Sequence, residues 1–243
     1  MIRLHVHGGF GRLGQAIARI AKASGDYEIS LSGRNEDLSK QAAAWDVTID
    51  VSQPAGSLAM AARCVSAGVP LVIGTTGHSP DQLKKLHSDA DRIALLLSPN
   101  FSVGVNLLFW LAAKTSEILG SEFDAEIVEL HHRLKKDSPS GTAKRLGEII
   151  AQSRSLEYGQ AARHGREGLV GERTKSEIGL HAIRGGDIVG EHTVYFAGPG
   201  ERIELTHRAS SRDTFAQGAL RAAGWLIGKP AGWYEMQDVL GLR

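Results

Sequence analysis

The residues with the richest chemistry lie in one segment, Glu129–Thr142, which reads ELHHRLKKDSPSGT. It holds two histidines, three basic residues and an aspartate ahead of a Ser-Gly-Thr turn. A histidine can take up or release a proton near neutral pH, so His131 is a candidate acid/base. Lys135 supplies a cationic partner for an anionic substrate group. The Asp-Ser-Pro run favours a loop, so these side chains meet through loop folding and not along one helix face.

The end of this segment, Ser140-Gly141-Thr142, precedes a stretch with helical spacing over Thr142–Ser153. The first N–H groups of a helix lack intrahelical partners and favour negative charge, so this turn suits a carboxylate. The alternative is that His131 is buried with its polar atoms satisfied while the lysines are solvated. A loop that concentrates cations beside a helix start favours the functional interpretation.

A second candidate site is the glycine-rich stretch near the N-terminus. Gly8, Gly11 and Gly14 have G-x-x-G-x-x-G spacing between a predicted strand over Ile2–His7 and a predicted helix over Gln15–Ala23. At such a junction glycine allows a tight turn and lets the backbone approach a pyrophosphate. The position in the first strand–helix unit favours dinucleotide binding over an ordinary turn.

The end of the second predicted strand bears on the choice of cofactor. Sites specific for NAD usually place a carboxylate there to bind the ribose 2′-OH. Here the strand ends in Ser32-Gly33-Arg34, with no carboxylate and with a guanidinium group. Arg34 and Arg12 therefore favour acceptance of a 2′-phosphate, and so NADPH as well as NADH, unless both are solvated surface residues.

The first hundred residues alternate short apolar runs with helical stretches, which implies parallel βαβ units. Two further loops, Gly74–Gly77 and Ser98–Phe101, follow predicted strands and so lie at the sheet edge where ligands bind. The predicted strands are Ile2–His7, Tyr27–Ser32, Val47–Val51, Pro70–Ile73 and Ile93–Leu97, and the helices include Ser57–Ala67 and Pro80–Ala90.

After Phe101 the pattern changes. Three runs with period-two alternation, Ile178–Ala182, Val194–Phe196 and Ile203–Leu205, predict an antiparallel sheet. Helices are expected over Val105–Ile118, Thr142–Ser153 and Thr214–Ile227, with an extended segment over Ala125–His131. We therefore expect an α/β protein: a Rossmann-type parallel-sheet domain formed by residues 1–102 and 212–243, and an α+β domain with an open mixed sheet formed by residues 103–211.

Composition excludes several classes of function. With 28 Lys and Arg against 27 Asp and Glu, the chain lacks the basic surface of a general nucleic-acid binder. Its one cysteine, Cys64, cannot form an internal disulfide, which fits a reducing compartment. No apolar run approaches the ~20 residues of a membrane helix, and MIRLHVHGGFG lacks the features of a signal peptide. The histidines lack metal-site spacing. We expect a cytoplasmic protein without a metal, nucleic-acid or membrane partner.

Several segments together identify a family. Gly8–Gly14, Gly74–Gly77, residues 100–106 (NFSVGVN), residues 131–142 and residues 184–192 (RGGDIVGEH) resemble bacterial dihydrodipicolinate reductases, also called 4-hydroxy-tetrahydrodipicolinate reductases. The resemblance covers essentially the whole chain. The family motif H-H-x-x-K-x-D-[AS]-P-S-G-T is highly specific and fits His131–Thr142.

The resemblance implies an oxidoreductase that reduces 4-hydroxy-tetrahydrodipicolinate with NADPH or NADH, in the diaminopimelate route to lysine. It implies a homotetramer assembled through the second domain. His131 would be the catalytic acid/base and Lys135 the second catalytic group. The substrate would be held by His132, Ser140, Gly141 and Thr142. The cofactor would be held by Gly8, Gly9, Phe10, Gly11, Arg12, Leu13, Gly33, Arg34, Gly74, Thr75, Thr76, Ser98, Pro99, Asn100 and Phe101.

Two other functions share part of this pattern. Another NAD(P)-dependent reductase of imines or amino acids, such as an aspartate dehydrogenase, would have the glycine turn but no reason for the carboxylate site formed by Lys135 and the Ser140-Gly141-Thr142 turn. A non-catalytic nucleotide-sensing protein would need the dinucleotide site alone.

Overall fold

The computed structural model describes residues 1–33 and 44–242. The chain divides into two compact units. The first runs from Met1 to Val103 and resumes at Asp213, and the second is Gly104–Arg212. No helix in the described part of the chain is both long enough and apolar enough to cross a membrane.

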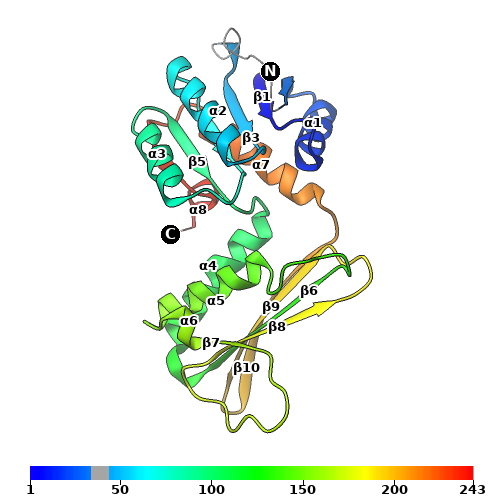
Figure 1. The fold of residues 1–243 in the computed structure, drawn as a ribbon, viewed down its shortest axis with the longest axis vertical. Helices are drawn as coiled ribbons and strands as arrows, with labels where there is room; N and C mark the ends of the chain where they lie inside the picture. The colour runs from blue at the N-terminus through cyan, green and yellow to red at the C-terminus, as the bar shows by residue number, and fades with distance from the viewer. Residues whose placement is uncertain (34–43, 243) are drawn as a thin grey trace. The chain divides into compact units, whose positions relative to one another are not determined.

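The first unit is a parallel sheet with the strand order β11-β5-β4-β3-β1-β2 (Figure 1). Apart from β2 and β3, which have residues outside the described part of the chain between them, strands and helices alternate as the sequence predicts. Its elements are β1 (Ile2–His7), α1 (Arg12–Ser24), β2 (Tyr27–Ser32), β3 (Val47–Asp50), α2 (Pro54–Ala67), β4 (Leu71–Ile73), α3 (Pro80–Ala90), β5 (Ala94–Leu97), α7 (Asp213–Leu226), β11 (Gly232–Tyr234) and α8 (Met236–Leu240).

Helices cover both faces of this sheet. Successive strand residues point to opposite faces, and β4 and β5 show this directly. Val72 and Leu96 pack in one core with α1 and α7, whereas Leu71 and Leu95 pack in a second core with α2 and α3. The predicted Rossmann-type fold is confirmed, and its parallel strands present the loops after β1, β3, β4 and β5 at one edge.

The second unit is a mixed sheet with the order β10-β9-β6-β8-β7. Helices α4 and α5 supply its core together with the inward-facing strand residues, among them Ile127, Leu180 and Phe196. Its elements are α4 (Val103–Leu119), the 3₁₀ turn Gly120–Glu122, β6 (Asp124–His131), α5 (Gly141–Ser153), α6 (Tyr158–Ala161), β7 (Ala162–His164), β8 (Ile178–Arg184), β9 (Gly190–Gly198) and β10 (Glu201–Ala209).

The expectation that the three alternating runs form one antiparallel sheet is wrong for the first of them. β9 and β10 do pair antiparallel, but β8 pairs parallel with β6. β6 lies between β8 and β9, so the Gly185-Gly186 turn does not close a hairpin between neighbouring strands. Period-two alternation shows which face of a strand is buried, and it carries no information about the neighbouring strand.

Candidate functional site

The glycine turn predicted to hold a dinucleotide joins β1 to α1. Gly8 has a φ of +80°, and a Cβ there would lie 2.6 Å from the carbonyl oxygen of Val51. A Cβ on Gly14 would collide with the carbonyl oxygen of Gly8. The turn therefore packs against α1 and the β3–α2 loop too closely for side chains, which is the arrangement that lets a backbone approach a pyrophosphate.

The start of α1 fits an anionic group. Its N-cap is Gly11, which supplies no side-chain hydrogen bond, and the first helical turn holds no acidic residue. The first N–H groups of the helix are thus left for a ligand, in a place where the helix dipole favours negative charge. Phe10 and Arg12 are exposed at this turn, and Leu13 is half-buried.

The end of β2 lies beside the same turn. The N–H groups of Gly8 and Gly9 donate to the Ser32 carbonyl at 2.9 and 3.1 Å. A Cβ on Gly33 would lie 3.2 Å from the Phe10 ring, so Gly33 packs under that ring. The next candidate, Arg34, falls outside the described residues.

The loops after β4 and β5 meet at the same edge. The Gly74 N–H donates to the Asp50 carbonyl at 2.8 Å, and the Ser98 N–H donates to the Ile73 carbonyl at 2.9 Å. The Phe101 ring lies 2.5 Å from where a Gly74 Cβ would stand, so the missing side chain lets the two loops pack together. Of the other predicted contacts in these loops, Thr76 and Pro99 are exposed, Asn100 is half-buried and Thr75 is buried.

A buried carboxylate that the sequence analysis left without a role joins these loops. Asp50, at the end of β3, has no exposed surface. Its oxygens accept hydrogen bonds from Ser52 Oγ at 2.6 Å, from Thr75 Oγ1 at 2.7 Å and from Ser57 Oγ. The three hydroxyls come from the β3–α2 loop, α2 and the loop after β4, so Asp50 ties these segments together at one edge of the sheet.

In the second unit the histidine of the motif ends β6 and is paired with a glutamate. Glu129 and His131 are two residues apart on the strand, so their side chains lie on the same, helix-covered face. His131 Nδ1 lies 2.5 Å from Glu129 Oε2. Arg184, at the end of β8, donates from its two terminal nitrogens to both Glu129 oxygens at 2.8 Å. The Glu129 side chain is 1% exposed, so this pairing takes place away from water.

This environment sets the protonation of both groups. Burial acts to raise the pKa of Glu129, but the hydrogen bonds from Arg184, His131 and the Ser140 N–H outweigh it, and the pKa is lowered. Burial lowers the pKa of His131 against the opposing effect of Glu129, with Lys135 acting in the same direction as burial. At neutral pH the pair is therefore an ionised carboxylate and a neutral imidazole.

The loop after β6 returns to the same cluster. Lys135 Nζ lies 2.9 Å from Asp137 Oδ1, and Arg184 also donates to the Asp137 carbonyl at 2.8 Å. The Lys135 side chain is 19% exposed, which leaves it accessible to a ligand. His132 donates its N–H to the Ile188 carbonyl, and within the described residues its buried Nδ1 has no hydrogen-bond partner.

The first residues of α5 divide into two kinds. Ser140 is the buried N-cap: its N–H donates to Glu129 Oε1 at 3.0 Å, and its hydroxyl accepts from the Ala143 N–H at 3.2 Å and lies 3.0 Å from His192 Nε2. Gly141 is exposed, and a Cβ there would meet nothing within 4 Å. The helix start is therefore fixed by Ser140 and open at Gly141.

The structure thus brings together His131, Lys135 and Ser140 in one unit, and the glycine turn, Gly33 and the loops after β4 and β5 in the other. Sequence reasoning gave no role to Glu129, Arg184 or His192. A signal for Glu129 was present, because a residue two positions before a strand histidine shares its face. Arg184 and Glu129 are 55 residues apart, and only the parallel β6–β8 pairing shows that they meet.

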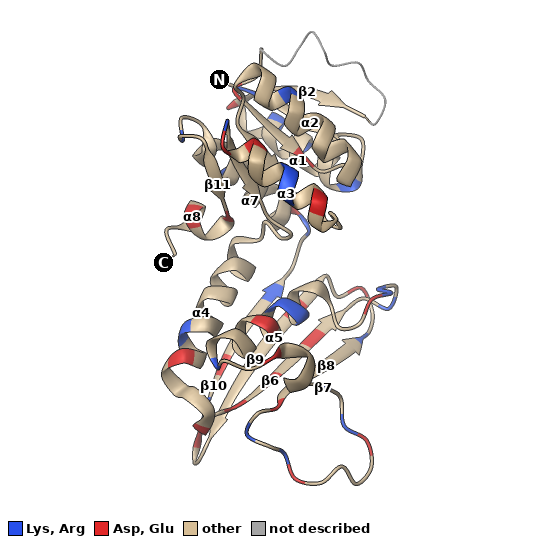
Figure 2. Cartoon of the chain, turned by 60° about the vertical axis from the view of Figure 1, so that its left-hand side comes forward, with Lys and Arg blue, Asp and Glu red and all other residues tan. Residues whose placement is uncertain are grey.

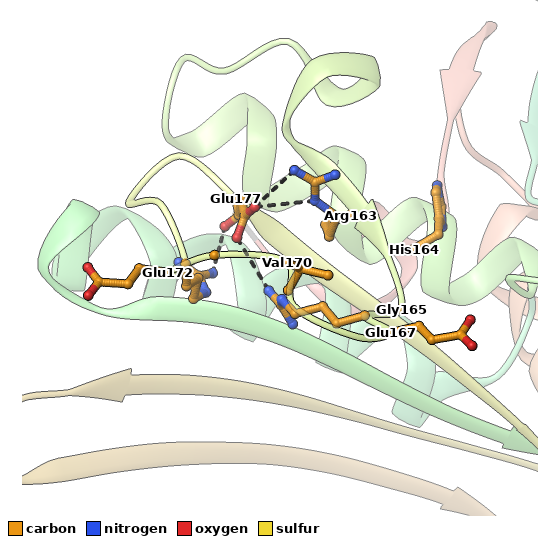
Figure 3. Close-up of a pocket in the computed structure, with 10 residues that line it drawn as sticks. Arg163, His164, Gly165, Glu167, Val170, Glu172 and Glu177 are labelled. Atoms are coloured by element: carbon orange, nitrogen blue, oxygen red, sulfur yellow. Dashed lines mark hydrogen bonds and ion pairs between the residues drawn. The ribbon is translucent and has the colours of Figure 1, made fainter.

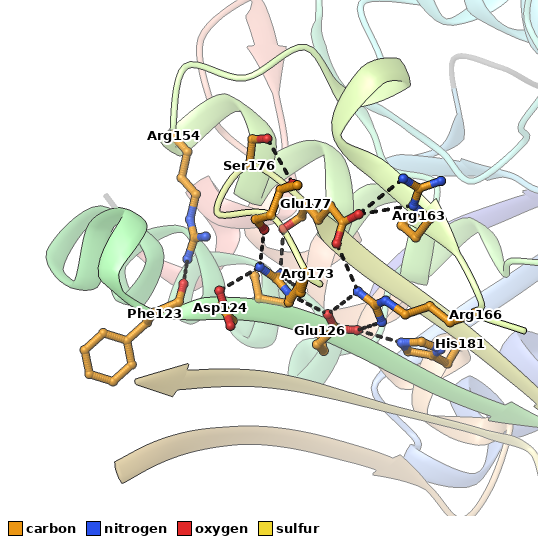
Figure 4. A network of polar contacts seen from close by, with 12 residues as sticks. Phe123, Asp124, Glu126, Arg154, Arg163, Arg166, Arg173, Ser176, Glu177 and His181 are labelled. Carbon is orange, nitrogen blue, oxygen red and sulfur yellow. Dashed lines mark hydrogen bonds and ion pairs between the residues drawn. The ribbon is translucent and has the colours of Figure 1, made fainter. Parts of the chain in front are cut away.

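A second carboxylate cluster lies on β6 (Figure 4). Glu126 accepts from both terminal nitrogens of Arg166 at 2.9 and 3.1 Å and from Arg173 Nε at 2.9 Å. His181 Nε2 lies 2.6 Å from its Oε2. These contacts join the sheet to residues 165–177, where Figure 2 shows basic and acidic residues close together.

A pocket of about 420 Å³ lies beside this cluster (Figure 3). Three arginines line it, namely Arg163, Arg166 and Arg173. Each of them is already paired with a carboxylate, Glu177 or Glu126. The pocket therefore offers an anion little uncompensated positive charge.

Comparison with known proteins gives matches over almost the whole chain. Residues 2–101 match the family model "Dihydrodipicolinate reductase, N-terminus", and residues 104–240 match "Dihydrodipicolinate reductase, C-terminus". A 4-hydroxy-tetrahydrodipicolinate reductase of Syntrophotalea carbinolica is 54% identical over 209 residues, covering 86% of this chain and 78% of the relative. One from Akkermansia muciniphila is 48% identical over 243 residues, covering 100% of this chain and 99% of the relative.

A solved structure shows the same fold. A dipicolinate-bound dihydrodipicolinate reductase of Paenisporosarcina sp. TG-14 superposes with a TM-score of 0.78 at 22% identity, covering 98% of each chain. An aspartate dehydrogenase of Thermotoga maritima has a TM-score of 0.51 at 10% identity. Sequence identity over the full length and both family models agree: the chain belongs to the dihydrodipicolinate reductase family.

Proposed function

We propose that this protein reduces 4-hydroxy-tetrahydrodipicolinate to tetrahydrodipicolinate with NAD(P)H. The observation that carries the proposal is the cluster at the end of β6. It combines a buried Glu129–His131 pair with an accessible Lys135 and an open helix start at Gly141. Full-length relatives that carry this reductase name support the assignment.

The first unit fits a dinucleotide. The glycine turn leaves no room for side chains, and the α1 start carries neither an acidic residue nor a side-chain cap. The residues that would hold the cofactor are those of the turn, Gly33, and the loops after β4 and β5. When bound, NAD(P)H supplies the hydride for the reduction.

The second unit supplies the groups for a dicarboxylate. Lys135 and the start of α5 at Gly141 and Thr142 would bind substrate carboxylates, and His132 would add a donor from its ring, whose buried Nδ1 has no hydrogen-bond partner within the described residues. Ser140 would act by holding the helix start in place, because its N–H and hydroxyl are both engaged within the protein.

His131 is the proton-handling group of the proposal. The balanced reaction consumes substrate, NAD(P)H and one proton, and it releases tetrahydrodipicolinate, NAD(P)⁺ and water. Since the pKa of His131 is lowered in the free protein, Nε2 must first take up a proton. A dianionic substrate beside the ring favours that uptake by raising the pKa.

The direct test is turnover of freshly generated substrate with each reduced nucleotide, followed by nicotinamide absorbance. We expect turnover with both and inhibition by pyridine-2,6-dicarboxylate. Reductive amination of oxaloacetate without turnover of the cyclic substrate would contradict the proposal and favour an amino-acid dehydrogenase. Nucleotide binding without any turnover would favour a sensor.

A variant tests the carboxylate site. Thr142→Val keeps the shape of the side chain and removes its hydroxyl, so it is expected to weaken binding of pyridine-2,6-dicarboxylate by about 1.5 kcal/mol. Calorimetric titration in the presence of saturating nucleotide measures this. Thr206→Val, which removes a hydroxyl on β10 that pairs with Thr193, is the matched control and should bind normally. Equal affinity in Thr142→Val and wild type would remove Thr142 from the site.

The cofactor preference has its own test. With Gly33 in place of a carboxylate, and Arg12 exposed at the turn, NADPH should be used at least as well as NADH. Arg34→Ala should lower kcat/KM for NADPH more than for NADH, because only NADPH carries a 2′-phosphate. Steady-state titrations at fixed ionic strength decide this. A strong preference of the wild type for NADH would contradict the assignment.

The proposal also assigns the two units. Residues 1–102 with 212–243 would bind the dinucleotide, and residues 103–211 would bind substrate and form a homotetramer. Ile183 on β8 is exposed on the face of the sheet that the helices do not cover, which supports an interface there. Analytical ultracentrifugation should give the mass of four chains, and a monomer at micromolar concentration would contradict it.

A further inference from the structure

Glu129 has all of its hydrogen-bonding capacity in use. An ionised carboxylate offers about four lone-pair positions and no proton. Oε1 accepts from the Ser140 N–H at 3.0 Å and from Arg184 at 2.8 Å. Oε2 accepts from Arg184 at 2.8 Å and faces His131 Nδ1 at 2.5 Å. Every partner other than the imidazole can only donate, so the Glu129 carboxyl needs no proton of its own to complete these hydrogen bonds.

The imidazole must therefore donate from Nδ1. Two acceptors cannot share a contact of this length, and the carboxylate brings no proton of its own. The neutral ring then carries its lone pair on Nε2. Within the described residues Nε2 has no hydrogen-bond partner, and it lies 3.0 Å from where a Cβ on Gly190 would stand. The absence of a side chain at Gly190 leaves space beside the reactive nitrogen.

We propose that Glu129 is a positioning residue: its carboxylate, anchored by Arg184, fixes His131 as the Nδ1–H tautomer, so that Nε2 exchanges the proton with the substrate. The identity of the substrate in this inference rests on the proposed function. The tautomer of His131 rests on the geometry of the second unit alone. Glu129 does not touch the substrate in this scheme and acts through His131.

The groups that face His131 come from several elements. They are Glu129 on β6, Arg184 on β8, His192 on β9, and Lys135 in the loop, which is itself paired with Asp137. Arg184 and Lys135 act to lower the pKa of His131, and Glu129 acts to raise it. Removing the Glu129 charge thus moves the pKa of His131 further down, and the protonated acid is lost at a lower pH.

The decisive substitution is Glu129→Gln, which keeps the size and removes the charge. An amide offers one oxygen and two N–H donors. Its nitrogen would therefore point at groups that had donated hydrogen bonds to a carboxylate oxygen. The imidazole can relieve this by moving its proton to Nε2 and accepting at Nδ1. We expect kcat to fall about 10-fold or more and the alkaline limb of the kcat/KM profile to move to lower pH.

Glu126→Gln is the matched control. Glu126 lies on the same strand and also contacts a histidine and arginines, but outside the candidate site. It should leave the pH profile of turnover unchanged. Equal changes in both variants, or an unshifted profile in Glu129→Gln, would overturn the proposal.

A measurement on the wild-type protein keeps the inference testable if Glu129→Gln fails to fold. Selective ¹⁵N-histidine labelling reports which ring nitrogen carries the proton, and His131→Gln identifies the resonance. The expected result is a protonated Nδ1 at neutral pH, and a protonated Nε2 would overturn the proposal. Absence of wild-type turnover with Nδ1 protonated would reject the proposed substrate and leave the tautomer assignment standing.

Discussion

Two glutamates on β6 have similar partners and different purposes. Glu126 and Glu129 each contact a histidine and at least one arginine. They are three residues apart, so the pleat places them on opposite faces of the sheet. Glu126 is 21% exposed and Glu129 is 1% exposed. The same chemical groups therefore occur once near water and once in the core.

The partners show what the difference means. Both arginines on Glu126 come from the 165–177 segment, so this carboxylate holds a loop against the sheet. Glu129 receives one arginine, one backbone N–H and one histidine, and that histidine has a nitrogen left over. His181 also keeps a second ring nitrogen, so the difference lies in the surroundings: only His131 has Lys135 and the start of α5 beside it, where an anionic substrate group can bind.

The comparison is tested most strongly by removing the two histidines in turn. His131→Gln should lower kcat by about 10²-fold or more, the usual contribution of an acid–base group. His181→Gln removes the equivalent partner of Glu126 and should leave turnover within about 3-fold of wild type, since it removes no acid–base group. Melting temperatures of both variants separate loss of chemistry from loss of fold. Near-normal turnover in His131→Gln would eliminate the distinction between the clusters.

The two arginine anchors should differ in their effect on stability. Arg184→Ala takes two charge-assisted hydrogen bonds from a carboxylate that is almost fully buried, and we expect a loss of about 2 kcal/mol. Arg166→Ala affects a carboxylate that keeps Arg173 and has partial access to water, so the loss should be about 1 kcal/mol or less. Urea unfolding measures both values. Equal losses would show that burial does not separate the clusters.

The sequence predicted most of the first unit because its described strands, apart from β2, are each followed along the chain by a helix. β1, β2 and α3 have the predicted bounds, and β4 and β5 start one residue late. In the second unit, alternation located β8, β9 and β10. It could not give their order in the sheet, where β6 lies between β8 and β9. The three-residue strands β7 and β11 are too short to show a period.

The candidate site divides in the same way. A motif marked His131 and Lys135 because they are close in sequence. Glu129 belongs to the same segment, yet a glutamate on a strand ordinarily faces water. Its burial depends on Arg184, which arrives from β8 through a long-range pairing. Short-range patterns therefore find the groups that react, and long-range pairing determines how they are held.

The smallest expected effect separates the clusters by pH. His192 lies beside Ser140, which also donates to Glu129. Burial and the neighbouring His131 lower the pKa of His192 to about 3. The unfolded chain binds that proton near the usual pH 6.5, so stability falls as pH drops below about 6.5. For Glu126, burial opposes the hydrogen bonds from Arg166, His181 and Arg173, which lower its pKa to about 2, so its contribution is lost only below about pH 4.5.

The wild-type protein should therefore lose unfolding free energy as the pH falls from 7.5 to 5.5. His192→Gln should reduce that loss by about 1 kcal/mol. Glu126→Gln should leave the loss over that range as in wild type and reduce it only under more acidic conditions. Urea unfolding at a series of pH values measures each slope. An acid sensitivity between pH 7.5 and 5.5 that disappears in Glu126→Gln instead would reverse the roles assigned to the two clusters. In that case the loop contacts, and not the buried histidines, would limit stability near neutral pH.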